Sequence, residues 1–171
     1  MAEPPGEATV FADGRLLFQG RSLRCALGRG GVIGPERKRE GDGATPAGLL
    51  KLRRLFYRAD RGQIPRTLLP RVPIAPDDGW CDAPGHAEYN RLVRLPFDAS
   101  HELMWRADEL YDLVAELGWN DAPVEAWRGS AIFLHLARPD YGPTAGCVAL
   151  ARADLLALLA AGLSALRVLP G

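Results

Sequence analysis

Cysteine is scarce in this 171-residue sequence, which contains only Cys25, Cys81 and Cys147. Three cysteines are too few for a disulfide framework, and an odd number leaves at least one unpaired within the chain. Cys25 and Cys81 are interpreted as structural residues, with a disulfide between them as the alternative in an oxidising compartment. No CxxC pair or HxxxH spacing occurs, so no metal site and no cofactor is predicted. The cysteine count therefore directs attention to a reactive thiol.

Long apolar runs and an excess of either charge are also missing. No stretch is long enough to cross a bilayer, and residues 1–6 lack the basic start and apolar region of a secretory signal. Lys plus Arg equals Asp plus Glu at 21 each, which gives no overall field to recruit nucleic acid or anionic lipid. The basic run at residues 37–39 predicts a solvated face.

Length and composition favour one domain, spanning residues 1–171, with a mainly β fold. Apolar residues make up 47% and charged residues 25% of the chain, both ordinary values for a globular domain. Fourteen prolines and nineteen glycines divide the chain into short segments, which is typical of many strands joined by turns.

The segment pattern predicts a series of strands and two helices. An Asp13-Gly14 turn joins two apolar segments into a hairpin, and residues 152–161 form a helix that Gly162 ends. A short helix is expected near residues 101–108, and residues 60–90 are expected to form a long surface excursion. The predicted strands are residues 9–11, 16–18, 25–28, 49–55, 91–95, 111–117, 131–137 and 166–169.

Cys147 is the candidate nucleophile. A thiol becomes a useful nucleophile when a base lies beside it and amide dipoles or a cation favour the thiolate. Gly146 allows a tight turn and a close approach of the backbone to a substrate. In such a turn the amides of Gly146 and Cys147 can point together at a developing oxyanion.

His135 is the candidate base, twelve residues before Cys147 in the apolar run 131–137. A strand, a turn and a returning strand can bring the two side chains into hydrogen-bonding reach. The alternative is a core histidine bonded to a carbonyl beside an inert buried cysteine, and His and Cys content alone favours that alternative.

The order of motifs resembles the L,D-transpeptidase (YkuD-type) family. Residues 132–135 and 144–148 are similar to its catalytic signature, in which a strand histidine precedes a Ser/Thr-x-Gly-Cys-hydrophobic run. Residues 43–48, Gly-Ala-Thr-Pro-Ala-Gly, resemble its Thr-Pro-x-Gly element. The segments 79–82, 89–91 and 117–120 resemble a branch of short proteobacterial members. The resemblance implies a curved β-sandwich of mixed sheets with one or two helices.

The resemblance also implies a reaction on peptidoglycan stem peptides. Cys147 would form a thioester at an L-configured centre of a donor stem, with His135 as general base and Gly146 in the oxyanion hole. The acyl group would pass to the side-chain amine of a diaminopimelate residue, which crosslinks the cell wall. A monomeric enzyme of the periplasm or cell envelope, open to carbapenem-type inhibitors, is expected from that chemistry.

Two departures from the family pattern concern specificity. Ala145 stands where Ser or His is common, and Ala149 stands where Arg or Asn is common two residues after the cysteine. Without the Arg or Asn side chain at position 149, binding of a donor carboxylate should be weaker than is usual in the family. Together with the proline-rich 60–90 segment, this favours the branch that uses L-Ala of the first stem position as donor.

Further candidate substrate contacts come from the turn between His135 and Cys147 and from the aromatic and polar segments upstream. A solvated turn is the alternative for the first group and a packed loop for the second. The candidates are Arg138, Tyr141, Thr144, Trp80, Asp82, Tyr89, Asn90 and Asn120.

Three other functions remain open from the sequence. A hydrolase of the same fold would trim stem peptides with water as acceptor, depending on how well the acceptor groove excludes water. A non-catalytic wall-binding module would keep the groove with an inactive thiol. A cytosolic thiol enzyme or redox protein is favoured only by the missing signal segment.

Overall fold

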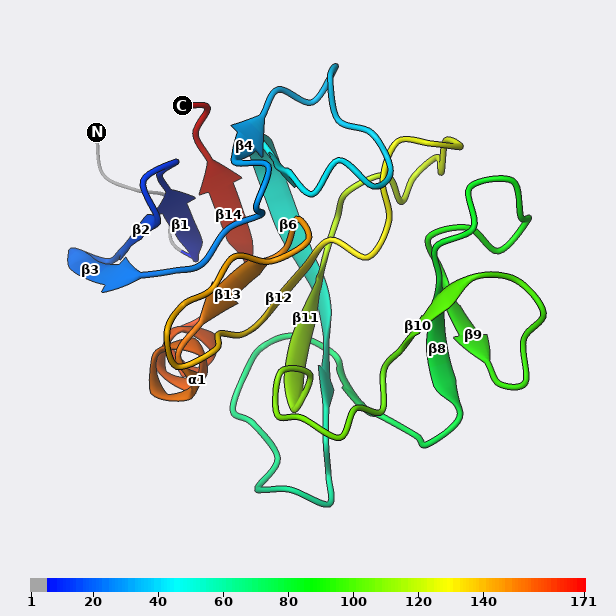
Figure 1. The fold of residues 1–171 in the computed structure, drawn as a ribbon. Coiled ribbons are helices and arrows are strands. Elements are labelled where there is room, and N and C mark those ends of the chain that lie inside the picture. The colour runs from blue at the N-terminus through cyan, green and yellow to red at the C-terminus, as the bar shows by residue number, and fades with distance from the viewer. Residues whose placement is uncertain (1–5) are drawn as a thin grey trace.

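The computed structural model describes residues 6–171 and is mainly β, as the sequence predicts (Figure 1). The elements are β1 (Glu7–Val10), β2 (Arg15–Phe18), β3 (Arg21–Arg24), β4 (Val32–Ile33), β5 (Thr45–Pro46), β6 (Gly48–Tyr57), β7 (Arg71–Pro73), β8 (Asp78–Cys81), β9 (Leu92–Arg94), β10 (His101–Leu103), β11 (Leu113–Leu117), β12 (Phe133–Leu136), β13 (Val148–Leu150), α1 (Arg152–Ala160) and β14 (Ala165–Val168).

A nine-stranded mixed sheet curls until it nearly closes into a barrel. Its order is β13-β12-β11-β6-β14-β1-β2-β3, with β7 beside β6. After β3, Ala26 exchanges two backbone hydrogen bonds with Ala149 of β13, at 2.8 and 2.9 Å. These bonds bring the two ends of the sheet together. Residues 25–28, predicted as a strand, instead contribute isolated bridges to Ala149 and Thr144.

The two faces of the large sheet bury different clusters, because successive side chains of a strand point to opposite faces. Leu134 and Leu136 lie on the face that packs with α1 in the main core. Phe133, Phe56 of β6 and Val114 of β11 lie on the other face in a second cluster. The short apolar strands are therefore buried on both sides, which explains why β12 reads as a continuous apolar run.

A three-stranded sheet, β10-β8-β9, covers the second cluster. Trp80 of β8 is only 2% exposed and makes edge-to-face contacts with Phe56 and Phe133, at ring-centroid distances of 6.2 and 5.0 Å. The prediction of a surface excursion over residues 60–90 is therefore wrong for β7 and β8. The helix predicted near residues 101–108 is also wrong, because β10 pairs there with β8.

The C-terminal helix α1 agrees with its prediction. Leu155, Leu158 and Leu159 are fully buried in the main core. Gly162 has a φ of 91°, and hydrogen bonds from Gly162 N to Leu159 O and from Leu163 N to Leu158 O form a Schellman motif. Among residues 6–171 no helix is long and apolar enough to cross a membrane.

Most of the other predicted strands are confirmed within one or two residues. The first hairpin forms with Thr9 opposite Leu17. The predicted strands at 49–55, 91–95, 111–117, 131–137 and 166–169 correspond to β6, β9, β11, β12 and β14.

Asn90 ties the small sheet to the segments beside β12, so we expect its loss to destabilise the protein. Its Oδ1 accepts from Trp80 Nε1 and from Ala131 N, both at 3.0 Å, and its Nδ2 donates to the carbonyls of Trp119 and Asn120. Replacing Asn90 by Ala leaves buried donors unpaired, which should lower the free energy of unfolding by about 3 kcal/mol.

Urea denaturation measures this change, and Asn90→Gly is the matched variant. Asn90 has a φ of 56°, a conformation that costs glycine nothing. The glycine variant should therefore be less destabilised than the alanine variant while still losing the side-chain bonds. Two variants with wild-type stability would contradict the assigned role.

Candidate active site

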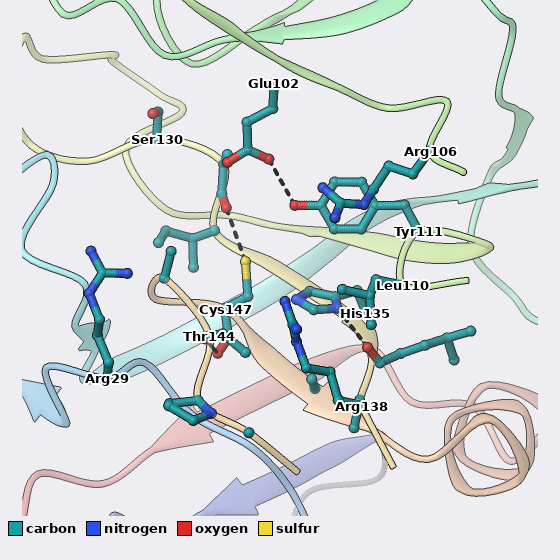
Figure 2. Close-up of a pocket in the computed structure, with 18 of the residues that line it drawn as sticks. Arg29, Glu102, Arg106, Leu110, Tyr111, Ser130, His135, Arg138, Thr144 and Cys147 are labelled. Atoms are coloured by element: carbon teal, nitrogen blue, oxygen red, sulfur yellow. Dashed lines mark hydrogen bonds between the residues drawn. The ribbon is translucent and has the colours of Figure 1, made fainter. Parts of the chain in front are cut away.

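The pairing of β12 with β13 places His135 and Cys147 on one face of the sheet. The strands are parallel, with Leu134 opposite Val148 and His135 opposite Ala149. Cys147 lies two residues before Ala149, so it shares the face of Ala149 and of His135. The expected turn exists, but residues 137–147 carry the chain back to the start of a parallel strand rather than into a hairpin. Figure 2 shows both side chains at one pocket.

The turn before Cys147 depends on close backbone packing at Gly146. Gly146 has a φ of 135°, and a Cβ there would lie 2.9 Å from the carbonyl oxygen of Ala44. Ala44 belongs to the 43–48 motif, whose Thr45 is fully buried and accepts a 2.9 Å hydrogen bond from Gly28 N. The two sequence motifs thus meet, and the upstream one supports the turn that carries the thiol.

The Cys147 thiol rests in its protonated form. It is 6% exposed, donates to the carbonyl of Ala131 at 3.2 Å and accepts from Phe133 N at 3.4 Å. Burial and the charge of Glu102 raise the pKa of Cys147 to about 12, against the smaller opposing effects of the Phe133 amide and Lys38. A base must therefore remove the proton when the thiol reacts.

His135 has the tautomer that such a base needs. Its Nδ1 lies 2.9 Å from the carbonyl oxygen of Leu136. A carbonyl only accepts, so Nδ1 carries the proton and Nε2 is the basic nitrogen. Burial lowers the pKa of His135 to about 4, although the Leu136 hydrogen bond acts in the opposite direction. The imidazole is therefore neutral at physiological pH.

The pocket that contains both groups has a volume of about 470 Å³. Its charged side chains come from four segments far apart in the sequence. They are Arg29, Lys38, Glu40, Glu102, Arg106 and Arg138. Four basic and two acidic groups suit a substrate that carries carboxylates.

One wall of the pocket holds the imidazole against an aromatic ring. The Tyr111 ring stands edge-on to His135 with centroids 5.3 Å apart, and also contacts Phe133 at 5.9 Å. The Tyr111 hydroxyl donates a 2.8 Å hydrogen bond to Glu102, which lies on β10 (Figure 2). This wall therefore links the small sheet to the imidazole.

Three predicted residues lie in the loop between His135 and Cys147. Arg138 and Thr144 line the pocket. Thr144 Oγ1 donates to Cys147 O at 2.7 Å and accepts from Gly146 N at 3.1 Å. The Gly146 amide is thus already engaged in this structure. Tyr141 lies outside the pocket lining, and its ring packs under the Arg24 guanidinium at 4.4 Å.

Five other predicted substrate contacts lie outside the lining of this pocket, and three of them are buried. Trp80 and Tyr89 are 2% exposed, and all amide bonding groups of Asn90 are used in the scaffold. The Tyr89 hydroxyl bonds to Glu40 and to Gly129 N. These residues support the site from behind, which is the packed-loop alternative.

Asp82 and Asn120 are partly exposed but do not line the pocket of Cys147. The Asn120 side chain bonds to Glu125 and to Gly129 O, which closes its own loop. The structure therefore does not bring these two residues to the nucleophile.

Sequence reasoning missed several pocket residues. Lys38 was placed on a solvated face, but it is 2% exposed and forms a 2.6 Å ion pair with Asp42. Glu102 and Arg106 fell within the wrongly predicted helix. No local sequence pattern identified Glu102 as a pocket residue or placed Lys38 near the thiol.

The remaining cysteines and possible metal ligands add no second site. Cys25 and Cys81 are buried free thiols in this structure, as their interpretation as structural residues requires. Within residues 6–171 no three His, Cys, Asp or Glu side chains come together in a metal-binding arrangement.

Comparison with known proteins gives one positive result. A family model described as the L,D-transpeptidase catalytic domain (YkuD) matches residues 5–164. No curated protein and no solved structure gives a significant match. The family match covers nearly the whole chain and includes the strand histidine, the Gly-Cys turn and the 43–48 segment. The chain therefore belongs to the YkuD family of L,D-transpeptidase catalytic domains.

Proposed function

We propose that this protein is a peptidoglycan L,D-transpeptidase in which Cys147 is the nucleophile and His135 the general base. The observation that carries the proposal is the shared face of β12 and β13. It presents a thiol and a neutral imidazole with a basic Nε2 to one charged pocket. This pairing is the arrangement that activates a buried thiol.

Acylation begins when a donor carbonyl enters the pocket. His135 Nε2 takes the thiol proton, the sulfur attacks the carbonyl carbon, and the imidazolium protonates the leaving amine. The turn amides at Gly146 and Cys147 stabilise the oxyanion, with the oxyanion replacing Thr144 Oγ1 as acceptor from Gly146 N. The product is a thioester at an L-configured centre of the stem.

Transfer to the side-chain amine of a diaminopimelate residue then forms the crosslink. Water as the acceptor would give stem-peptide hydrolysis by the same thioester. From these substrates we propose that the protein acts in the periplasm or cell envelope, as a monomer on stem peptides.

Donor recognition in this proposal uses arginines other than the Arg or Asn that is common two residues after the cysteine. Ala149 lines the pocket next to His135 and offers no charge, whereas Arg138 and Arg106 both act electrostatically on His135. We assign Arg138, with Thr144 beside it, to the donor stem, and we retain L-Ala of the first position as the preferred acyl donor. Product analysis by mass spectrometry that finds only linkages between two diaminopimelates would rule out that preference.

Labelling by a carbapenem tests the nucleophile and the base. We expect one adduct per molecule on Cys147 in intact-mass and peptide-mass measurements at neutral pH. Cys147→Ala should abolish the adduct, and His135→Ala should slow its formation about a hundredfold or more, since general bases contribute about 10²–10⁴-fold. Cys25→Ala is the matched control and should label like wild type. An adduct that persists in Cys147→Ala would contradict the assignment.

The pH dependence of acylation tests the neutral dyad. The pKa of His135 is about 4, so the base is present above that pH and is lost as the pH falls through it. The carbapenem acylation rate should therefore be nearly constant between about pH 5 and 8 and should fall below about pH 4. A tenfold rise for each pH unit up to pH 8 would instead indicate attack by free thiolate without His135.

Replacing Arg138 by Ala tests carboxylate recognition. The loss of a charge-assisted contact should raise KM for a donor stem with a free carboxylate about tenfold. Arg37→Ala, which removes an exposed arginine outside the pocket, is the control. A matched donor with an amidated carboxylate should show little change between wild type and Arg138→Ala. Equal effects on both donors would exclude the assigned contact.

A further inference from the structure

Glu102 faces the thiol from the opposite side of the pocket. It lies on β10, where it is opposite Trp80 in the small sheet, and it lines the same pocket as Cys147 and His135. Figure 2 shows the Glu102 carboxylate and the Cys147 sulfur on facing sides of the pocket. The thiol itself donates to the Ala131 carbonyl. The family signature at residues 132–135 and 144–148 includes no acid at this place.

The Glu102 carboxylate is fixed in position. Its Oε2 accepts the 2.8 Å hydrogen bond from the Tyr111 hydroxyl. The Tyr111 ring in turn contacts His135 and Phe133, so Tyr111 sets the distance between the acid and the imidazole. The carboxylate is therefore held in a defined position relative to the imidazole.

Both acidic and basic groups act on Glu102. Burial raises the pKa of its carboxyl, and the like charges of Asp82 and Glu40 act in the same direction, against the Tyr111 hydrogen bond and the cation of Arg106. Arg29 and Arg138 line the pocket on the side of Thr144 and His135, away from Glu102 in Figure 2. Glu102 therefore lies on the other side of the sulfur from Arg29 and Arg138, with Arg106 as the cation on its own side.

We propose that Glu102 binds the protonated amine of the acyl acceptor and takes its first proton. The inference rests on the proposed transpeptidase function and assigns the acceptor side of that same pocket. A primary amine similar to that of lysine is almost wholly protonated at neutral pH, so it reaches the thioester as an ammonium that cannot attack. A carboxylate beside the sulfur both attracts this cation and removes the proton that blocks its lone pair.

The proton transfers balance as follows in the transfer step. The ammonium gives one proton to Glu102, and the amine nitrogen then attacks the thioester carbonyl carbon. His135 takes the second proton from the nitrogen as the new C–N bond forms. The C–S bond breaks, the sulfur takes the proton from His135, and Glu102 releases its proton to solvent. One amide replaces one thioester, and the enzyme returns to its thiol form.

The test compares acceptors of different charge in Glu102→Gln. A diaminopimelate-containing peptide supplies an ammonium, and hydroxylamine supplies a nucleophile that is largely uncharged at neutral pH. We expect the KM for the peptide acceptor to rise about tenfold or more. Hydroxylamine transfer and carbapenem acylation should not fall below wild type, because loss of the Glu102 charge lowers the pKa of the Cys147 thiol.

Two further variants complete the experiment. Glu109→Gln removes an exposed acid outside the pocket and should behave like wild type. Tyr111→Phe keeps the ring but removes the hydroxyl that holds Glu102, so it should raise the same KM by a smaller factor. Circular dichroism and melting of each variant verify that it is folded.

The outcomes separate this inference from the proposed function. Failure of a carbapenem to acylate wild-type Cys147 overturns the proposed function. Acylation of wild type followed by an unchanged peptide-acceptor KM in Glu102→Gln overturns only the role of Glu102. An equal loss of transfer to the peptide and to hydroxylamine in Glu102→Gln also overturns the role of Glu102. Consumption of the wild-type acyl-enzyme by water alone overturns both that role and transfer to an amine.

Discussion

The parallel pairing of β12 with β13 is the constraint on which the rest of the site depends. One register places His135 opposite Ala149 and leaves Cys147 two residues earlier on the same face. A slip by one residue would turn the thiol into the main core, because side chains alternate between the two faces. The buried leucines at positions 134, 136 and 150 fix that register by filling the core on the opposite face.

Backbone contacts on both sides of the Gly146 turn position Cys147. Gly146 packs directly on the Ala44 carbonyl, and residues 26–29 bond to Thr144 and Ala149. The same contacts bring the two ends of the curled sheet together. These contacts therefore close the large sheet and position the thiol, so a change in the 43–48 segment should affect both.

Burial gives the site its resting state. The thiol and the imidazole are both neutral, because burial raises the pKa of one and lowers the pKa of the other. Charged groups line the pocket around them, with Arg29 and Arg138 on the side of Thr144 and His135 and with Glu102 and Arg106 on the opposite side. In the function we propose, the charged groups direct substrates, and proton transfer from Cys147 to His135 within a low-dielectric pocket activates the thiol.

The sequence by itself determined the mainly β class and the C-terminal helix with its Gly162 stop, and it predicted that Cys147 and His135 meet at one pocket, because these features are encoded in local patterns and ordered motifs. Tertiary structure decided which other side chains reach the pocket. Glu102 was assigned to a helix and Lys38 to a solvated face, yet strand pairing with β8 and the ion pair to Asp42 bring both to the thiol. Trp80 and Asn90 were expected to contact substrate, but both are buried and hydrogen-bonded to one another. Those positions depend on contacts between distant segments, which local sequence patterns do not specify.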